Sequence, residues 1–111
     1  MVDNPIVTSF PKITIVMPSY NQVRYLEEAM LSVLTQDYPN LEFIVIDGGS
    51  TDGSQQVIEK YDSQISYWHS RVDQGQSYAL SEGFAKSTGE IMGWLNSDDI
   101  YEKDAFLKVA S

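Results

Sequence analysis

The sequence predicts an α/β fold in which a parallel four-stranded sheet carries helices on both faces. Short β-branched, apolar runs alternate along the chain with segments whose apolar residues recur every three or four positions. Turn-forming residues separate the two kinds of segment. The resulting β-α-β-α-β-α-β-α order favours parallel strands joined by right-handed crossovers, and we expect the strand order 3-2-1-4.

The first half of the chain predicts a strand, a helix and a second strand. Residues 12–17, KITIVM, are a β-branched run that predicts a buried strand ending at Pro18. Residues 21–36 have apolar side chains at i, i+4 and i+7, which indicates an amphipathic helix with Asn21 as a suitable N-cap. The sequence QDYPN ends this helix, and residues 41–46, LEFIVI, predict the second strand.

The second half repeats the alternation. The segment DGGSTDGS is a turn rich in glycine and capping residues, and residues 55–61 follow it as a short helix. Residues 65–69 predict the third strand, residues 76–87 the third helix and residues 90–95 the fourth strand. After an acidic turn, residues 103–110 begin a fourth helix.

Length and composition indicate one small domain. A chain of 111 residues with 42% hydrophobic residues can build one core. Residues 1–11 contain two prolines and lack the positive start of a signal peptide, so we interpret them as a lead-in segment and residues 12–111 as the folded part. The chain has no cysteine, so it carries neither a disulfide framework nor a thiolate site.

The charge balance disfavours two classes of partner. Seven basic and sixteen acidic side chains give a formal net charge of −9, so we expect no nucleic-acid partner, which would need a basic patch. A polybasic membrane patch is also missing, and no apolar run is long enough to cross a bilayer. We therefore expect a cytoplasmic protein, with peripheral membrane attachment of the full-length protein left open.

All four predicted strands end in small, polar or acidic residues. The four exits are PSYN at 18–21, DGGS at 47–50, SRVDQG at 70–75 and NSDD at 96–99. Ligands of open α/β sheets bind outside the carboxyl ends of the strands, near the switch in strand order. The exits of the two inner strands flank that crevice, which places Ser19, Tyr20 and Asn21 opposite Asp98.

Two adjacent carboxylates, Asp98 and Asp99, follow the fourth strand. Like charges at this separation repel each other, and a solvated turn or a bound cation would relieve the repulsion. An acidic crevice repels a bare diphosphate but accepts one bridged by Mg²⁺ or Mn²⁺, since such ions are held by one or two carboxylates together with phosphate oxygens. The residues alone leave the turn and the metal site as alternatives.

Two stretches of the sequence together resemble a known family. They are ITIVMPSYNQVRYLEEAMLSVLTQDYPNLEFIVIDGGSTDGS and GEIMGWLNSDD, within residues 12–101. They resemble the nucleotide-binding half of the family 2 glycosyltransferases, which have a Rossmann-like GT-A fold. The resemblance implies an inverting enzyme that transfers a sugar from a nucleotide diphosphate donor. It also implies an acceptor glycan or lipid-linked glycan, in bacterial-type polysaccharide, cell-wall or glycoconjugate synthesis.

The resemblance also implies roles for individual residues. Pro18, Ser19, Tyr20 and Asn21 would lie against the nucleoside, and Asp47 would read the base. In the DxD-like motif, Asn96 would face the ribose, Ser97 would also contact the nucleotide, Asp98 would bind the metal and Asp99 would support it.

Two residues depart from the pattern of the family. Asn96 stands in place of the first acid of DxD; its amide can still form a hydrogen bond with a ribose hydroxyl, but it supplies no charge to the metal. Gly48 stands where some members have a second acid that contacts uracil, so a UDP donor is not implied.

The family's general base, an aspartate, lies well downstream of DxD, and this chain ends about ten residues past Asp99. We therefore expect no catalytic residue within the chain, which we interpret as the donor-binding portion of a longer enzyme and expect to be inactive alone. The missing half would leave the outer edge of the fourth strand bare beside Met92 and Trp94. We therefore expect either marginal stability or self-association, by pairing of that edge or by exchange of a terminal segment.

Two other classes of function were considered. A metal-dependent nucleotidyltransferase would want a basic, glycine-rich loop after the first strand, and PSYNQV is not one. A non-catalytic module of the receiver type would need an acidic pair at that exit, where Pro18 and Ser19 stand. In the third exit, Asp73 either approaches the donor or caps its loop, and Arg71 is expected to be solvated or ion-paired.

Overall fold

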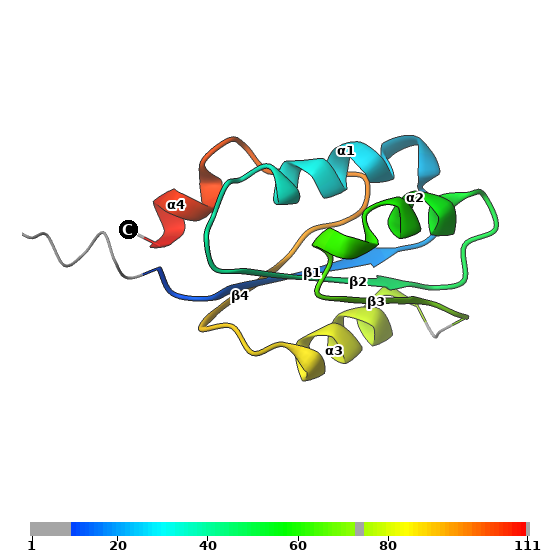
Figure 1. Cartoon of the computed structure of the whole chain (residues 1–111). Helices are drawn as coiled ribbons and strands as arrows, with labels where there is room; N and C mark the ends of the chain where they lie inside the picture. The colour runs from blue at the N-terminus through cyan, green and yellow to red at the C-terminus, as the bar shows by residue number, and fades with distance from the viewer. Residues whose placement is uncertain (1–9, 73–74, 111) are drawn as a thin grey trace, which may run out of the picture.

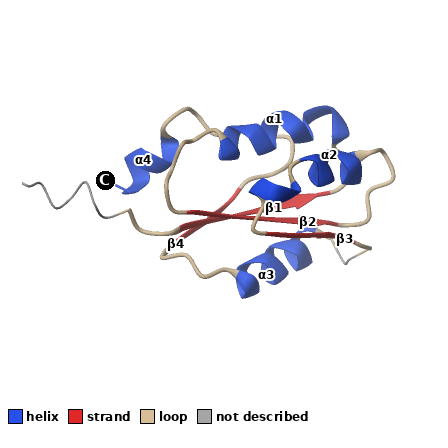
Figure 2. Ribbon diagram, in the orientation of Figure 1, coloured by secondary structure: helices blue, strands red, loops and turns tan. Residues whose placement is uncertain are grey.

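The computed structural model describes residues 10–72 and 75–110. The elements are β1 (Ile13–Ser19), α1 (Val23–Leu34), β2 (Leu41–Asp47), α2 (Ser54–Lys60), a 3₁₀ turn (Asp62–Gln64), β3 (Tyr67–Ser70), α3 (Gln76–Lys86), β4 (Ile91–Trp94) and α4 (Ala105–Ala110). The strands are parallel and lie in the order β3-β2-β1-β4, which confirms the predicted topology. Helices α1 and α2 cover one face of the sheet and α3 covers the other (Figure 1), as the ribbon coloured by element type also shows (Figure 2).

The larger part of the core lies between the sheet and α1. Alternate residues of β1, namely Ile13, Ile15 and Met17, are buried in the same cluster as Leu26 and Met30 of α1. The period of two on the strand and the period of about four on the helix therefore meet in one apolar layer. This is why the sequence pattern predicted both elements.

A second apolar cluster joins α3 to the opposite face. Val16, Ile44 and Ile46 point to this side and pack with Ala79 of α3. Gly83 allows the close approach of the helix, because a Cβ atom at that position would lie 2.3 Å from Cγ1 of Val16. Both faces of the sheet are thus covered; β1 is buried throughout, and β2 is buried from Phe43 to Asp47.

Strand β1 does not end at Pro18, contrary to the prediction, but runs on to Ser19. The carbonyl of Val16 accepts from Leu95 N on the β4 side, whereas the carbonyl of Ser19 accepts from Gly48 N on the β2 side. Successive residues of a strand alternate between its two neighbours, so Pro18 faces the β4 side, where pairing has already ended at Trp94. A residue without an N–H is tolerated there.

Helix α1 begins later than predicted, and Asn21 is not its N-cap. Asn21 has a left-handed φ of 50°, and Gln22 occupies the cap position without a side-chain hydrogen bond. The cap comes from another loop, because Val23 N donates to Oδ2 of Asp52 at 3.0 Å. A carboxylate at the start of a helix accepts a hydrogen bond from an otherwise unpaired N–H, and its negative charge interacts favourably with the positive end of the helix dipole.

Two further boundaries differ from the prediction because of local turns. The 3₁₀ turn at Asp62–Gln64 delays the third strand until Tyr67. The last helix begins at Ala105, since Asp104 has a φ of 64° that a right-handed helix excludes. Gln36 then fixes this region to α1, because its Nε2 donates to Glu102 O at 2.7 Å and its Oε1 accepts from Phe106 N at 3.1 Å.

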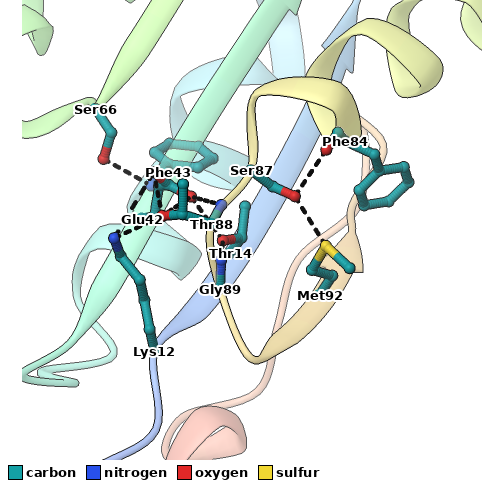
Figure 3. Close-up of polar contacts among 10 residues, drawn as sticks. All are labelled: Lys12, Thr14, Glu42, Phe43, Ser66, Phe84, Ser87, Thr88, Gly89 and Met92. Carbon is teal, nitrogen blue, oxygen red and sulfur yellow. Dashed lines mark hydrogen bonds and ion pairs between the residues drawn. The ribbon is translucent and has the colours of Figure 1, made fainter.

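A polar cluster ties the connection between α3 and β4 to the sheet (Figure 3). The carboxylate of Glu42 on β2 accepts from Thr14 Oγ1 at 2.7 Å and from Thr88 N at 2.8 Å. Gly89 N donates in turn to Thr14 Oγ1 at 2.9 Å, and Lys12 Nζ donates to Thr88 Oγ1 at 2.7 Å. This cluster pairs the buried hydroxyl of Thr14 and sets the position at which β4 enters the sheet.

Strand β4 lies at the edge of the described sheet. Its side chains Met92 and Trp94 are 55% and 45% exposed, although they lie on a strand paired to the central β1. Within residues 10–72 and 75–110, no helix is long and apolar enough to cross a membrane.

Candidate functional site

A pocket of about 550 Å³ opens at the carboxyl ends of the strands. Such a volume is in the range of small-molecule sites. The residues that line it come from all four strand exits and the start of α3: Pro18, Ser19, Tyr20, Gln22, Gly48, Gly49, Val72, Gly75, Gln76, Ala79, Asn96, Ser97 and Asp98. The crevice predicted from the strand exits is therefore present as one cavity.

The exit of β1 supplies one wall of the pocket. Ser19 is 4% exposed, and within the described chain its hydroxyl has no hydrogen-bond partner. Such a group is expected to meet a ligand or water, because a buried polar atom without a partner is costly. Tyr20 follows it at 60% exposure, so its ring is free to cover a planar group.

Asn21 was predicted to face the same ligand, but it does not line the pocket. Its backbone N donates to Ser50 Oγ at 2.9 Å, and its Oδ1 accepts from Thr51 N at 2.8 Å. The residue therefore joins the β1 exit to the β2 exit. Its left-handed backbone turns the side chain toward that second loop, which sequence spacing could not indicate.

Asp47 is the last residue of β2 and does not line the pocket. Its side chain is fully buried, and its carboxylate accepts from Gly49 N, Ser50 N, Ser50 Oγ and Ser70 Oγ at 3.2, 2.8, 2.7 and 2.7 Å. Direct base reading by Asp47 stays a prediction that this geometry does not favour. The carboxylate instead holds Gly49, which does line the pocket.

The exit of β4 supplies the opposite wall. Asn96, Ser97 and Asp98 of the DxD-like motif line the pocket, and their roles toward a ligand stay predictions. Asp99 does not line it, because its Oδ1 accepts from Ile100 N at 2.9 Å and its own N donates to Asn96 O at 3.0 Å. The two carboxylates therefore differ: Asp98 faces the cavity, while Asp99 closes the turn behind it. Metal ligation by Asp99 stays a prediction without support from this geometry.

The start of α3 contributes residues that the sequence did not single out. Gly75 and Gln76 line the pocket, and Ala79 lies one turn further along the helix. The sequence order could have indicated these residues, because α3 follows the exit of β3 and therefore begins at the same edge of the sheet as the pocket. Asp73, which the sequence predicts either to approach the donor or to cap its loop, lies outside the described residues.

Among the described lining residues, Asp98 is the one acidic residue, and none is lysine, arginine or histidine. Arg71 does not line the pocket; it lies 3.4 Å from Oε2 of Glu82, which His69 Nε2 also approaches at 2.6 Å. Burial opposes the ionisation of Glu82, but the contacts from His69 and Arg71 outweigh it and lower the pKa of the carboxyl group. Arg71 is thus ion-paired with Glu82 and does not line the pocket.

No group of three or more His, Cys, Asp or Glu side chains placed to hold a metal occurs in the described part of the chain. A magnesium-type ion does not require one, since it keeps several waters and takes further oxygens from substrate phosphates. Asp98, a single carboxylate on a pocket wall without cationic side chains, fits that mode of binding.

The model of the family described as glycosyl transferase family 2 matches residues 14–111. The chain belongs to glycosyl transferase family 2. The match covers every strand exit that lines the pocket, so the family includes the site and not only the core of the fold.

Curated relatives agree with this assignment. An uncharacterized glycosyltransferase of Nostoc sp. is 37% identical over 82% of this chain and 29% of its own length. An uncharacterized glycosyltransferase of Haemophilus influenzae is 37% identical over 90% of this chain and 41% of its own length. TuaG of Bacillus subtilis, whose name assigns it to teichuronic acid biosynthesis, is 32% identical over 88% of this chain and 40% of its own length. The chain thus spans less than half the length of these relatives.

Solved structures show the same fold. TarS of S. aureus superimposes with a TM-score of 0.79 and 27% identity, covering 89% of this chain and 19% of TarS. A TarS structure in complex with UDP-GlcNAc gives a TM-score of 0.76 and 29% identity, covering 89% of this chain and 30% of that one. The mannosyltransferase PcManGT from Pyrobaculum calidifontis, in complex with GDP-Man and Mn²⁺, superimposes with a TM-score of 0.77 and 27% sequence identity. The match covers 87% of this chain and 30% of PcManGT. The GT-A type of α/β fold is therefore confirmed.

Proposed function

We propose that this chain is the nucleotide-sugar-binding portion of an inverting family 2 glycosyltransferase. The observation that carries the proposal is the pocket itself, which joins the β1 and β4 exits and holds the free hydroxyl of Ser19 and the carboxylate of Asp98. Pro18, Ser19 and Tyr20 would bind the nucleoside, and Asn96 and Ser97 would lie beside the ribose. Relatives that bind UDP-GlcNAc and GDP-Man support a nucleotide diphosphate sugar as the donor class.

Asp98 would hold Mg²⁺ or Mn²⁺ together with the diphosphate. When bound, such an ion supplies Lewis-acid stabilisation of the leaving diphosphate. Within the described lining, no lysine or arginine is available to neutralise phosphates, so the negative wall would repel the donor without a cation. The Mn²⁺ in the complex of PcManGT supports this choice of cofactor.

The remaining parts of the reaction would come from outside this chain. Residues 1–11 would be a lead-in segment, and residues 12–111 the donor-binding part of the domain. A downstream base would activate the acceptor hydroxyl, so the chain alone would not transfer sugar. The acceptor would be a glycan or lipid-linked glycan in polysaccharide or cell-wall synthesis, a proposal supported by the name of TuaG.

Calorimetric titration with UDP, GDP and dTDP tests the donor-binding proposal. We expect at least one of them to bind when MgCl₂ or MnCl₂ is present, and the binding to disappear when EDTA is added. Adenosine diphosphate and a free sugar serve as controls for non-specific binding. Binding that EDTA leaves unchanged would contradict the role of the metal, and no binding of any of the three would contradict the nucleotide site.

A further inference from the structure

A hydrogen bond across the pocket joins α3 to the exit of β4. Nε2 of Gln76 donates to Oδ1 of Asn96 at 2.8 Å. Both side chains line the cavity, and they come from segments that are 20 residues apart in sequence. The bond therefore links two walls of the site, and neither the family resemblance nor the sequence pattern assigned a role to Gln76.

The direction of this bond determines what Asn96 offers to a ligand. A primary amide has one oxygen that accepts and one nitrogen that donates two hydrogens. Gln76 takes one of the two lone pairs of Asn96 Oδ1 and fixes the orientation of the amide, so the Nδ2 group is the part of the side chain that keeps its full hydrogen-bonding capacity for the cavity. An aspartate at position 96 would instead present a second carboxylate close in sequence to Asp98.

The position of Gln76 suits it to hold Asn96. It is the first residue of α3, and Gly75 before it has a φ of 104°, a left-handed conformation that turns the chain into the helix. Ala79 N donates to Gly75 O at 3.0 Å, so the first turn is formed, and Ala79 is buried against the sheet. The side chain of Gln76 therefore extends from an anchored turn, not from a free loop.

We propose that Gln76 is a positioning residue of the nucleotide site, which fixes Asn96 so that it presents N–H donors to the ligand. This inference rests on the proposed function. A donor at this position suits an acceptor oxygen of a ribose or a phosphate, and it leaves Asp98 as the charged group of the described wall. Gln76 itself acts through Asn96 and not on the reacting atoms.

The first part of the test examines the bond in the ligand-free protein. NMR measurement of scalar coupling through the hydrogen bond should connect Nε2 of Gln76 to Cγ of Asn96. Coupling in the opposite direction, from Nδ2 of Asn96 to Cδ of Gln76, overturns the proposal, and so does the absence of any coupling. This readout does not depend on knowing the donor nucleotide.

The second part is a double-mutant cycle read by calorimetry with UDP and with GDP in MnCl₂. Gln76→Ala should weaken binding by about three- to tenfold, which is the effect of losing one hydrogen bond. In an Asn96→Ala background the same substitution should change binding by less than about twofold, because its target is gone. Gln55→Ala, in the first turn of α2 and outside the pocket, is the matched control and should bind as the parent does.

The outcomes separate this inference from the proposed function. Equal effects of Gln76→Ala in both backgrounds overturn the positioning role, and so does a wild-type affinity in Gln76→Ala. If the NMR coupling is present but the parent protein binds neither nucleotide, the proposed function is overturned and the role of Gln76 in nucleotide binding with it. If the parent binds but the coupling is missing, only the present inference is overturned.

Discussion

The backbone N–H of Val23 donates a hydrogen bond to Oδ2 of Asp52, which lies 29 residues away in sequence, at 3.0 Å. The start of α1 is thus capped by the loop that follows β2. Ser54 N and Ser54 Oγ donate to the other oxygen of the same carboxylate, at 3.0 and 2.6 Å. The Asp52 side chain therefore accepts hydrogen bonds from the first residues of both α1 and α2. It joins the exits of β1 and β2, from which Ser19 and Gly49 line the pocket.

Replacing Asp52 should destabilise the fold, although its side chain does not line the pocket. We expect Asp52→Ala to lower the free energy of unfolding by about 1 kcal/mol, the usual cost of removing an N-cap. Urea denaturation measures this loss. Asp52→Asn should retain part of the stability, since an amide oxygen still accepts; if Asp52→Ala unfolds at the same urea concentration as the parent, the loop does not cap α1.

The Glu42 cluster should make stability depend on acid pH. Burial raises the pKa of this carboxyl, but hydrogen bonds from Thr88 and Thr14 and the charge of Lys12 outweigh burial and lower it below its usual value. A lowered pKa in the folded state contributes stability above the pKa of the unfolded chain, and this stability is lost as the pH falls through the folded value. We expect the stability gap between the parent and Glu42→Gln to shrink on acidification.

Urea denaturation of both proteins from neutral pH to about pH 3 tests this expectation. Glu59→Gln is the control, because Glu59 lies on the exposed side of α2. A gap for Glu42→Gln that stays constant over the whole range would show that ionised Glu42 contributes nothing to stability.

Gly49 should tolerate a side chain less well than Gly75. Both have a left-handed backbone, with φ of 85° and 104°. A Cβ atom at position 49 would lie 2.9 Å from the backbone N of Val72, whereas one at position 75 would meet nothing within 4 Å. We expect each alanine variant to lose about 1 kcal/mol from the backbone alone, and Gly49→Ala to lose more because Val72 must move.

Thermal melting of Gly49→Ala and Gly75→Ala, measured side by side, decides this point. Equal melting temperatures would mean that the turn after β2 adapts to the added methyl group. They would also weaken the argument that Gly49 is held in place by Asp47.

The 111-residue chain should associate through the edge of β4. Unpaired N–H and C=O groups at a sheet edge favour pairing with another chain, and Met92 and Trp94 are exposed beside it. We expect light scattering to show growth of the mean mass with protein concentration, and Trp94→Lys to reduce it. Tyr25→Lys is the matched control, because Tyr25 is also 45% exposed but lies on α1. Equal effects of both substitutions would indicate non-specific association through exposed apolar side chains and not pairing of the β4 edge.

The topology could be predicted from the sequence because each element is determined by its own periodicity. Val16, for example, is buried because it belongs to a β-branched strand, whichever helix covers it. The strand order then followed from the alternation of strands and helices. The pocket could be anticipated for the same reason, since parallel strands end at one edge.

The details that the sequence could not indicate depend on contacts between segments far apart in the chain. Asn21 is of a residue type that commonly caps helices and precedes α1 in the sequence, but the hydrogen bond that caps α1 comes from Asp52. Asp47 has the position of a base-reading acid, but Ser50 and Ser70 use its carboxylate inside the fold. Gln76 was missed because its partner is 20 residues away. No local pattern encodes these pairings.

The central claim is that Asp98 binds a divalent ion that bridges a nucleoside diphosphate to the pocket. Water-proton relaxation in solutions of Mn²⁺, UDP or GDP, and protein tests it most directly, because a bound paramagnetic ion enhances the relaxation. We predict strong enhancement for the parent only when the nucleotide is present, its loss in Asp98→Asn, and its retention in Asp99→Asn, whose side chain lies outside the pocket lining. An Asp98→Asn protein that folds and shows the same enhancement as the parent would contradict the claim.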